Sequence, residues 1–142
     1  MIRKLKEKDI DRVIFLEETF LTESIGKEML QDSLNTPHLY FYVYELKDLV
    51  IGYIGACILA DQTEILNFVI DEAFQRNGYG QLLLNKIIEE SINLNSTNIV
   101  LEVNVSNQKG INFYLKNNFK NIHTRKNYYK DGSDAYLMKK EL

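Results

Sequence analysis

The sequence lacks tryptophan altogether and contains only one cysteine and one proline. Because Cys57 is the only cysteine, no internal disulfide can form, and we expect a reducing, cytoplasmic setting. No apolar stretch is long enough to cross a bilayer. The first residues, Met1 to Lys8, carry charges with no apolar run behind them, unlike a signal peptide. The sequence therefore predicts neither secretion nor a membrane partner.

The composition that remains is that of an ordinary globular domain. Hydrophobic residues make up 45% and charged residues 26% of the 142 residues, so we expect a single domain over 1–142. The net charge of −3 argues against a broad nucleic-acid-binding surface. His38 and His123 are isolated and lack the spacing of metal ligands, so we expect no metal.

Hydrophobic periodicity predicts seven strands and four helices. The expected strands are Ile2–Leu5, Leu39–Leu46, Leu49–Ala60, Glu64–Ile70, Asn98–Val105, Phe119–Lys126 and Ala135–Lys140. The expected helices are Asp9–Phe20, Lys27–Leu34, Gly78–Asn93 and Asn107–Asn117. Leading strands followed by alternating strands and helices predict an α/β (mixed α+β) fold, in which helices cover both faces of a mixed sheet.

Particular residues mark the expected turns and helix ends. Lys47-Asp48 and Asp61-Gln62 are expected to turn the chain between neighbouring strands. Asp9 and Ser106 are typical N-cap residues, so each is expected to cap the helix that follows it. Asn117-Asn118 is typical of the left-handed conformation that ends a helix.

Gly78 and Gly80 stand where an expected strand gives way to an expected helix. A helix start presents unpaired N–H groups and the positive end of the helix dipole. Glycine at such a start lets an anion approach the main chain, which favours a pyrophosphate cradle. A tight turn before an ordinary helix produces the same pattern, so the glycines alone leave both interpretations open. No Lys-Ser/Thr pair follows them, which disfavours an NTPase.

Several side chains have both a catalytic and a structural interpretation. Glu102 lies in an apolar strand, where burial would raise its pKa as a general base requires, but it could also face solvent. Tyr114 is either a core aromatic or a general acid at a cleft. Tyr128 and Tyr129 either line a substrate groove or lie half-exposed at a strand end. Cys57 is expected to be a buried, inert thiol because no basic residue is near it in sequence.

The segment Gln75-Arg76-Asn77-Gly78-Tyr79-Gly80 resembles the (Gln/Arg)-x-x-Gly-x-(Gly/Ala) coenzyme A signature of the GNAT N-acetyltransferases. More specifically, the chain resembles the RimI-like branch, which acetylates the N-terminal alanine of a small-subunit ribosomal protein. This resemblance extends over nearly the whole chain. It is strongest in Asn67 to Gln81, Leu101 to Asn107, Phe113 to Phe119, and Arg125 to Tyr129 together with Asp134-Ala135.

The resemblance implies a fold and an acetyl donor. Two central parallel strands, here Glu64–Asp71 and Asn98–Val105, would splay apart in a twisted sheet of six to seven strands and admit acetyl-CoA. The main chain of the first strand would pair with the pantetheine arm through Phe68, Val69 and Ile70. The loop N–H groups would hold the pyrophosphate through Arg76, Asn77, Gly78, Tyr79, Gly80 and Gln81. Asn107 would hydrogen-bond the coenzyme.

The resemblance also implies a reaction. Glu102 would be the general base, directly or through water, and Tyr114 the general acid that protonates the leaving thiolate. The amine would attack the thioester within a ternary complex, so no covalent intermediate on Cys57 is needed. Tyr128 and Tyr129 are the expected substrate-binding residues.

Departures from the family pattern leave the acceptor open. Gln81 stands where a cationic residue is common, and Asn104 where some relatives carry arginine near the acceptor. The favoured acceptor is the N-terminus of a protein, and a ribosomal protein is one possible acceptor. A small-molecule amine (polyamine or antibiotic-like) and a non-catalytic acyl-CoA-binding module are the alternatives. Either a monomer or a homodimer is compatible with the sequence.

Overall fold

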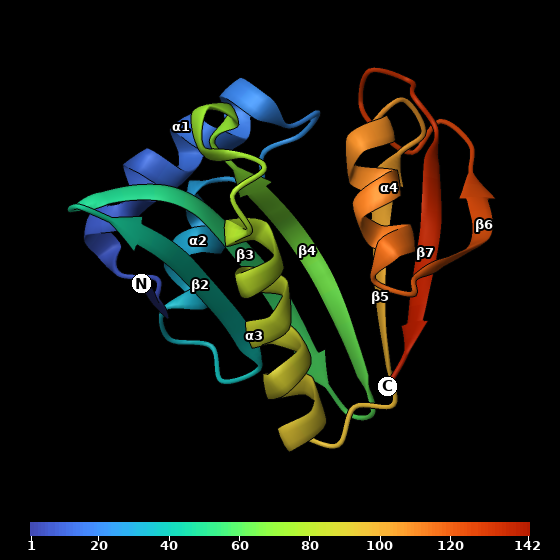
Figure 1. Cartoon of the computed structure of the whole chain (residues 1–142), viewed down its shortest axis with the longest axis horizontal. Coiled ribbons are helices and arrows are strands. Elements are labelled where there is room, and N and C mark those ends of the chain that lie inside the picture. The colour runs from blue at the N-terminus through green and yellow to red at the C-terminus, as the bar shows by residue number, and fades with distance from the viewer.

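One mixed sheet of seven strands, in the order β1-β2-β3-β4-β5-β7-β6, organises the computed structural model, which describes all 142 residues (Figure 1). Only β4 and β5 run parallel to each other. The strands are β1 (Ile2–Lys4), β2 (Leu39–Leu46), β3 (Leu49–Leu59), β4 (Gln62–Ile70), β5 (Asn98–Asn104), β6 (Lys120–Arg125) and β7 (Ala135–Glu141). The α-helices are α1 (Ile10–Phe20), α2 (Lys27–Ser33), α3 (Tyr79–Asn93) and α4 (Gln108–Lys116).

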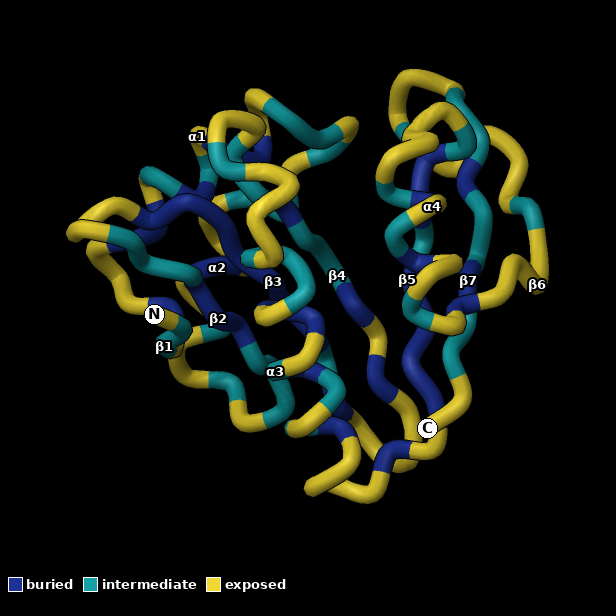
Figure 2. Tube along the Cα trace, viewed as in Figure 1, coloured by how far each residue is buried: buried dark blue, intermediate teal, exposed yellow.

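Helices cover both faces of the sheet, as the sequence predicts. The neighbouring residues Tyr53 and Ile54 point to opposite faces of β3 because side chains alternate along a strand. Ile54 belongs to a core of 14 buried residues beneath α3 and α4. Tyr53 belongs to a second core of 10 buried residues, which includes Val13 of α1 and Leu30 of α2. Figure 2 shows these buried residues along the central strands.

The two parallel strands, β4 and β5, pair with each other at only one end. β4 and β5 pair through three residues each, Gln62–Glu64 with Asn98–Val100. The buried Thr63 hydroxyl lies 2.7 Å from Ser91 Oγ and 2.9 Å from Ser96 Oγ, which ties β4 to the end of α3 and the turn before β5. This polar cluster closes the joined end.

Beyond Glu64 the two parallel strands separate. Ile65 pairs with Ala56 of β3 and Asn67 with Gly55, so Leu66 is an extra residue in β4. Such a bulge bends a strand and increases its twist. The rest of β4 keeps only β3 as a partner, and the rest of β5 keeps only β7. Figure 1 shows the V-shaped gap between them, which confirms the expected splay.

Neither expected capping hydrogen bond forms, although Asp9 does occupy the N-cap position of α1. The Asp9 carboxylate accepts the Lys6 N–H at 2.8 Å and pairs with Arg3 at 2.8 Å, so it closes a 3-10 turn before α1. Asn107, rather than Ser106, caps α4, because its Oδ1 accepts the Gly110 N–H at 3.0 Å. In both cases another polar partner competes for the predicted capping side chain.

Turn positions agree with expectation except for one shift. The turn expected at Asp61-Gln62 lies one residue earlier, at Ala60 and Asp61, since Gln62 already pairs with Leu59. Lys47 and Asp48 adopt positive φ angles of 48° and 66° in the turn between β2 and β3, as predicted. Asn118, with φ of 67°, ends α4 in the left-handed conformation.

Cys57 is half-buried, so the sequence analysis overestimated the burial of its thiol. Its neighbour across the strand pair is Glu64. Burial and the Glu64 carboxylate raise the pKa of the Cys57 thiol, which makes it a poor nucleophile. No helix in the chain is both long and apolar enough to cross a membrane.

Candidate active site

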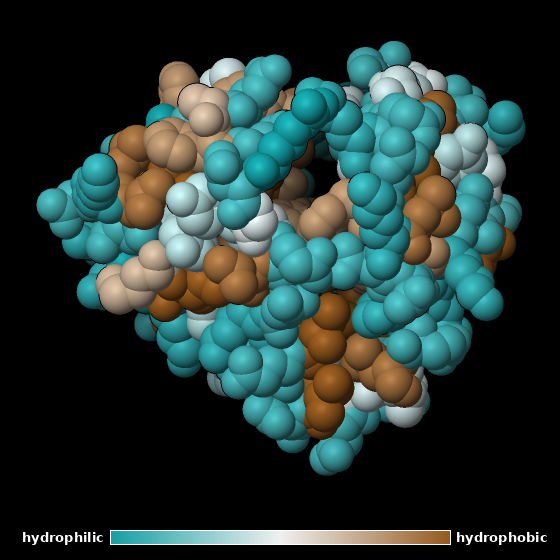
Figure 3. Space-filling view, in the orientation of Figure 1, coloured by the Kyte–Doolittle hydropathy of each residue, from teal (hydrophilic) through white to brown (hydrophobic).

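A cavity of about 440 Å³ occupies the gap between β4 and β5. It is bounded by the α1–α2 loop, the bulged part of β4, the end of β5, the start of α4 and the β6–β7 loop. Figure 3 shows the surface hollowed between the two halves of the molecule. Of the residues singled out in the sequence, this cavity brings together Phe68, Glu102, Asn107, Tyr114, Tyr128 and Tyr129.

Glu102 reaches this cavity from the sheet face that α1 and α2 cover. Its neighbours Leu101 and Val103 lie in the core beneath α4, so Glu102 points to the opposite face. The side chain is 16% exposed, and its Oε1 lies 3.3 Å from Arg125 Nε. Burial and the Glu64 carboxylate raise the pKa of Glu102, while Arg125 opposes them. The raised pKa makes the Glu102 carboxylate a stronger base than an exposed glutamate.

Tyr114 reaches the cavity from the other face, on α4. Its ring packs against Phe68, Phe113 and Phe119, with centroid distances of 6.5, 5.6 and 5.5 Å. Burial and the nearby Tyr129 raise the pKa of Tyr114, so the phenol stays protonated. No protein group hydrogen-bonds its hydroxyl, and no enclosed side-chain polar atom lacks a partner, so the hydroxyl is open to the cavity. Glu102 and Tyr114 therefore line the same cavity from opposite faces of the sheet.

The glycine segment forms a run of free main-chain donors at the start of α3, and none of its residues lines the cavity. The N–H groups of residues 76–81 donate no hydrogen bond, and the first helical bond of α3 is from Leu82 to Gly78, at 3.1 Å. Arg76 and Gly78 have positive φ angles of 65° and 84°, which turn the chain into the helix. Consecutive free N–H groups at a helix start bind anions, so the segment can hold a pyrophosphate.

The two glycines of this segment serve different purposes. Position 78 favours glycine because of its backbone conformation: a φ of 84° strains any residue with a side chain. Gly80 has no such angle, and a Cβ there would lie 3.5 Å from Ile70 and 3.7 Å from Phe68, an ordinary contact. The fold therefore does not require glycine at position 80, and a small residue there keeps the approach to the neighbouring N–H groups open.

The open edge of β4 offers further main-chain groups. The Asp71 N–H donates to Ile51 O at 2.7 Å, and hydrogen-bonded pairs alternate along an antiparallel ladder. Val69 therefore bonds to β3, whereas the main chain of Phe68 and Ile70 faces the gap. Gln75 Nε2 already donates to the Ile70 carbonyl at 3.0 Å. The groups left for a ligand are those of Phe68 and the Ile70 N–H.

The tyrosine pair lies in the loop between β6 and β7. Tyr128 and Tyr129 stack edge-to-face at 5.0 Å, and Tyr128 remains 47% exposed, so they line the cavity and are also partly exposed. Burial and Tyr128 raise the pKa of Tyr129 to about 12, so its hydroxyl stays a donor. The neighbouring Lys130 N–H donates to Glu23 Oε1 of the α1–α2 loop at 2.6 Å, which joins the two loops above the gap.

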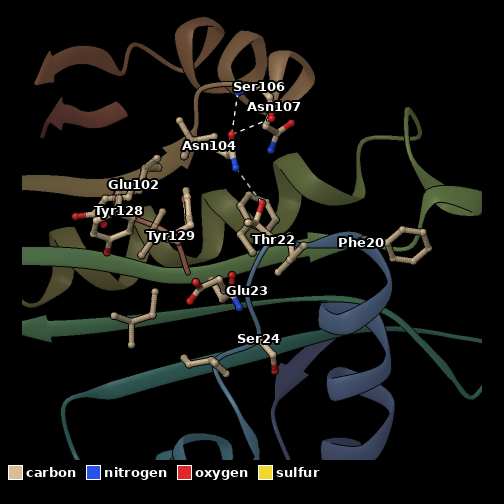
Figure 4. A pocket seen from close by; sticks show the side chains of 18 of the residues that line it. Phe20, Thr22, Glu23, Ser24, Glu102, Asn104, Ser106, Asn107, Tyr128 and Tyr129 are labelled. Carbon is tan, nitrogen blue, oxygen red and sulfur yellow. Dashed lines mark hydrogen bonds between the residues drawn. The ribbon is translucent and has the colours of Figure 1, made fainter. Parts of the chain in front are cut away.

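Asn104, at the end of β5, ties three loops together around the cavity (Figure 4). Its Nδ2 donates to Thr22 Oγ1 at 3.2 Å and to Ser133 Oγ at 2.9 Å. Its Oδ1 accepts from the Ser106 N–H at 2.9 Å and from Ser106 Oγ at 2.8 Å. Asparagine can both donate and accept here, whereas an arginine could only donate.

Sequence reasoning missed Glu17, a fully buried carboxylate on α1. It accepts hydrogen bonds from Ser24 Oγ at 2.9 Å, the Ile25 N–H at 3.2 Å, Asn67 Nδ2 at 2.6 Å and the Tyr53 hydroxyl. It thereby fixes the α1–α2 loop against β4 at the cavity. A signal was present, because Glu17 falls at helical spacing from Ile10 and Val13 on the buried stripe of α1.

No group of three His, Cys, Asp or Glu side chains is placed to hold a metal ion. His38 is half-buried beside β2 and His123 is exposed on β6, so neither lies in the cavity. The titratable side chains that line the cavity include Glu102 and Tyr114, which could exchange protons with a bound molecule.

Comparison with known proteins agrees with this geometry. A family model described as the acetyltransferase (GNAT) family matches residues 4–119. The N-alpha-acetyltransferase of Saccharolobus solfataricus is 31% identical, over 99% of this chain and 92% of that protein. The ribosomal protein bS18-alanine N-acetyltransferase of Haemophilus ducreyi is 30% identical, over 94% of this chain and 92% of that protein. The crystal structure of Ard1 from Thermoplasma volcanium matches with a TM-score of 0.92 at 31% identity, covering 100% of this chain and 97% of that one. The chain therefore belongs to the GNAT family of acetyltransferases.

Proposed function

We propose that this protein moves the acetyl group of acetyl-CoA to the N-terminal α-amine of a protein, of the ribosomal protein alanine type. The observation that carries the proposal is that Glu102 and Tyr114 line one cavity from opposite faces of the sheet. A donor on the α3–α4 side and an amine on the other side could then react through the gap. The names of the relatives from Saccharolobus solfataricus and Haemophilus ducreyi support an N-terminal acceptor.

The residues present fit the donor. The free N–H groups of 76–81 would hold the pyrophosphate, and the free main-chain groups of Phe68 and Ile70 would hold the pantetheine arm. Asn107 lines the cavity at the start of α4 and would add a side-chain contact through its Nδ2, because its Oδ1 caps the helix. Bound acetyl-CoA supplies an acetyl group activated as a thioester.

Glu102 and Tyr114 would divide the proton transfers between them. An amine must lose a proton to act as a nucleophile, and Glu102 accepts it, directly or through one water. The raised pKa of Glu102 suits this role, because it makes the carboxylate a better proton acceptor. Tyr114 holds its proton until the leaving sulfur needs one, and the unpartnered hydroxyl is free to donate it. Direct attack makes a nucleophilic cysteine unnecessary.

The proposed acceptor side of the cavity suits the N-terminus of a substrate protein. Tyr128 and Tyr129 narrow the cavity between two loops, and Glu23 and Glu102 place negative charge where a protonated amine would arrive. The proposed setting is the cytoplasm, where a half-buried free thiol such as Cys57 stays reduced.

An acetyl-transfer screen by mass spectrometry tests this proposal. The panel holds peptides with free N-termini, alanine-first sequences of small-subunit ribosomal proteins among them, their N-terminally blocked forms, and polyamine and aminoglycoside amines. We expect acetylation of free N-termini and none of the blocked peptides. The Glu102→Gln variant should bind coenzyme normally and lose roughly 10²- to 10⁴-fold in kcat/KM. Turnover of small amines with no turnover of any peptide would overturn the proposed acceptor.

A further inference from the structure

Gln81 and Asn117 form a reciprocal amide pair that joins the first turn of α3 to the end of α4. Gln81 Nε2 donates to Asn117 Oδ1 at 2.7 Å, and Asn117 Nδ2 donates to Gln81 Oε1 at 3.1 Å. Both residues are half-buried, and no other hydrogen bond links the two helices. The pair is therefore the one polar bridge between α3 and α4.

Neighbouring groups hold both amides in this orientation. The second hydrogen of Gln81 Nε2 goes to Asn85 Oδ1 at 2.9 Å. Asn117 Nδ2 also donates to the Phe113 carbonyl at 2.9 Å, and Lys140 Nζ donates to the Asn117 carbonyl at 2.9 Å. The pair also gives a reason for glutamine at position 81. A lysine or arginine there has donors only, so it could not accept the Asn117 hydrogen.

The position of the pair relates it to the coenzyme. Gln81 carries the last free N–H of the proposed pyrophosphate cradle, and Asn117 follows the proposed general acid, Tyr114, by three residues. Because α3 and α4 flank the gap between β4 and β5, the pair bridges that gap on their face of the sheet, where β4 and β5 pair only up to Glu64 (Figure 1).

We propose that the Gln81–Asn117 pair is a latch across the coenzyme cleft, whose opening governs how fast acetyl-CoA and CoA enter and leave. This inference rests on the proposed function only in so far as the cleft binds coenzyme; it does not depend on the acceptor. A closed pair connects two halves that the sheet leaves separate, and exchange of a long ligand through the gap requires the pair to part.

The experiment measures coenzyme exchange directly. Fluorescently labelled CoA is bound to the full chain and displaced by unlabelled CoA in a stopped-flow instrument. Asn117→Ala and Gln81→Ala each remove both hydrogen bonds, so we expect dissociation to become about 5- to 30-fold faster, given about 1 kcal/mol for each neutral hydrogen bond. Association should become faster as well, so that Kd changes less than either rate.

Two further variants separate a latch from a general loss of packing. Asn112→Ala removes a comparable Gln–Asn bond, in which Gln108 Nε2 donates to Asn112 Oδ1 at 2.8 Å on the exposed face of α4, and should leave both rates unchanged. The double variant Gln81→Asn with Asn117→Gln keeps one side-chain amide at each of the two positions, and the combined length of the two side chains is unchanged. It should restore slow exchange.

The outcomes are distinct. If the unmodified chain binds no CoA, the proposed function itself fails. If CoA binds but dissociates at the same rate from Asn117→Ala and Gln81→Ala, the latch is wrong. A lowered unfolding midpoint with unchanged rates would likewise contradict the latch and show that the pair only stabilises the fold. Faster exchange in both single variants with rescue in the double variant supports it.

Discussion

The two sides of the cleft are built from different chemical groups. On the side of α3 and α4, the donors are main-chain N–H groups of residues 76–81 and the free edge of β4. On the side of α1 and α2, the cavity is shaped by side chains, notably those of Glu102, Tyr128 and Asn104. These side chains come from a strand and loops far apart in sequence, and Asn104 and Glu17 fix the loops in place.

This difference bears on which side can change during evolution. A main-chain site depends on backbone shape, so it tolerates most substitutions except at a few glycines. A side-chain site changes whenever one of its residues changes. The GNAT family match, residues 4–119, covers the main-chain donors and Glu102 but not Tyr128 and Tyr129. From the difference in chemistry we expect relatives to vary more on the side-chain side than on the main-chain side.

Removing the Tyr114 hydroxyl should have the largest effect and should separate chemistry from binding. Tyr114→Phe keeps the ring among Phe68, Phe113 and Phe119, and the hydroxyl has no protein partner to lose. We expect kcat to fall roughly 10²- to 10⁴-fold, as for a lost general acid, with coenzyme Kd and the unfolding midpoint unchanged. Tyr136→Phe, which removes a hydroxyl outside the cavity, is the matched control. A normal kcat in Tyr114→Phe would assign the acid to another group.

The glycine segment offers a test of the main-chain side. Gly80→Val adds a side chain larger than the glycine or alanine of the family signature, which a close ligand would meet. We expect coenzyme Kd to weaken roughly 5- to 150-fold, the effect of about 1–3 kcal/mol of overpacking. Calorimetric titration with CoA measures this directly.

Gly78→Ala is the matched control for that test. A φ of 84° strains an alanine by about 1–2 kcal/mol, so the main effect of this variant should be a lower unfolding midpoint. If both glycine variants lost stability equally and bound CoA equally, the distinction between a glycine for the backbone and a glycine for the ligand would be wrong.

Asn104 offers the corresponding test of the side-chain side. Asn104→Ala removes the bonds to Thr22 and Ser133, which align the two loops over the acceptor. We expect KM for a peptide acceptor to rise roughly 5- to 10-fold, equivalent to about one lost hydrogen bond, while coenzyme Kd stays constant. Ser133→Ala removes one of these bonds only and should have a smaller effect. A change confined to coenzyme binding would contradict the division of the cleft into two sides.

The same contrast explains how much of the molecule could be predicted from its sequence. Hydrophobic periodicity is a local property, so the seven strands, the four helices and the left-handed Asn118 were predictable. The anion-binding segment was also local, because glycine spacing and a helix start lie within a few residues of each other. Where two polar partners competed, local rules failed in part: Asp9 occupies the predicted N-cap position without a capping hydrogen bond, and Asn107 replaces Ser106 as the cap of α4.

The acceptor side could not be assembled from sequence in the same way. Glu102 could face solvent or a cavity. Which of the two applies depends on how β4 bends at the Leu66 bulge, and no local sequence pattern predicts that bulge. The partners of Asn104 lie 82 and 29 residues away along the chain, and those of Glu17 as far as 50 residues away. Such contacts arise only from the tertiary fold, so their residues were missed or left with two interpretations.

The pH dependence of the reaction gives the finest test of the acceptor side. Burial and Glu64 raise the pKa of Glu102, while Arg125 lowers it. Since the base works only when ionised, kcat/KM should rise with pH through that pKa. Glu64→Gln removes a negative neighbour, which lowers the pKa and moves the ascending limb to lower pH. Arg125→Gln removes the ion pair at 3.3 Å, which raises the pKa and moves the limb to higher pH. One peptide acceptor is used throughout, so its own amine titrates identically in every profile. Shifts in the same direction, or no shift in either variant, would place the base elsewhere than at Glu102.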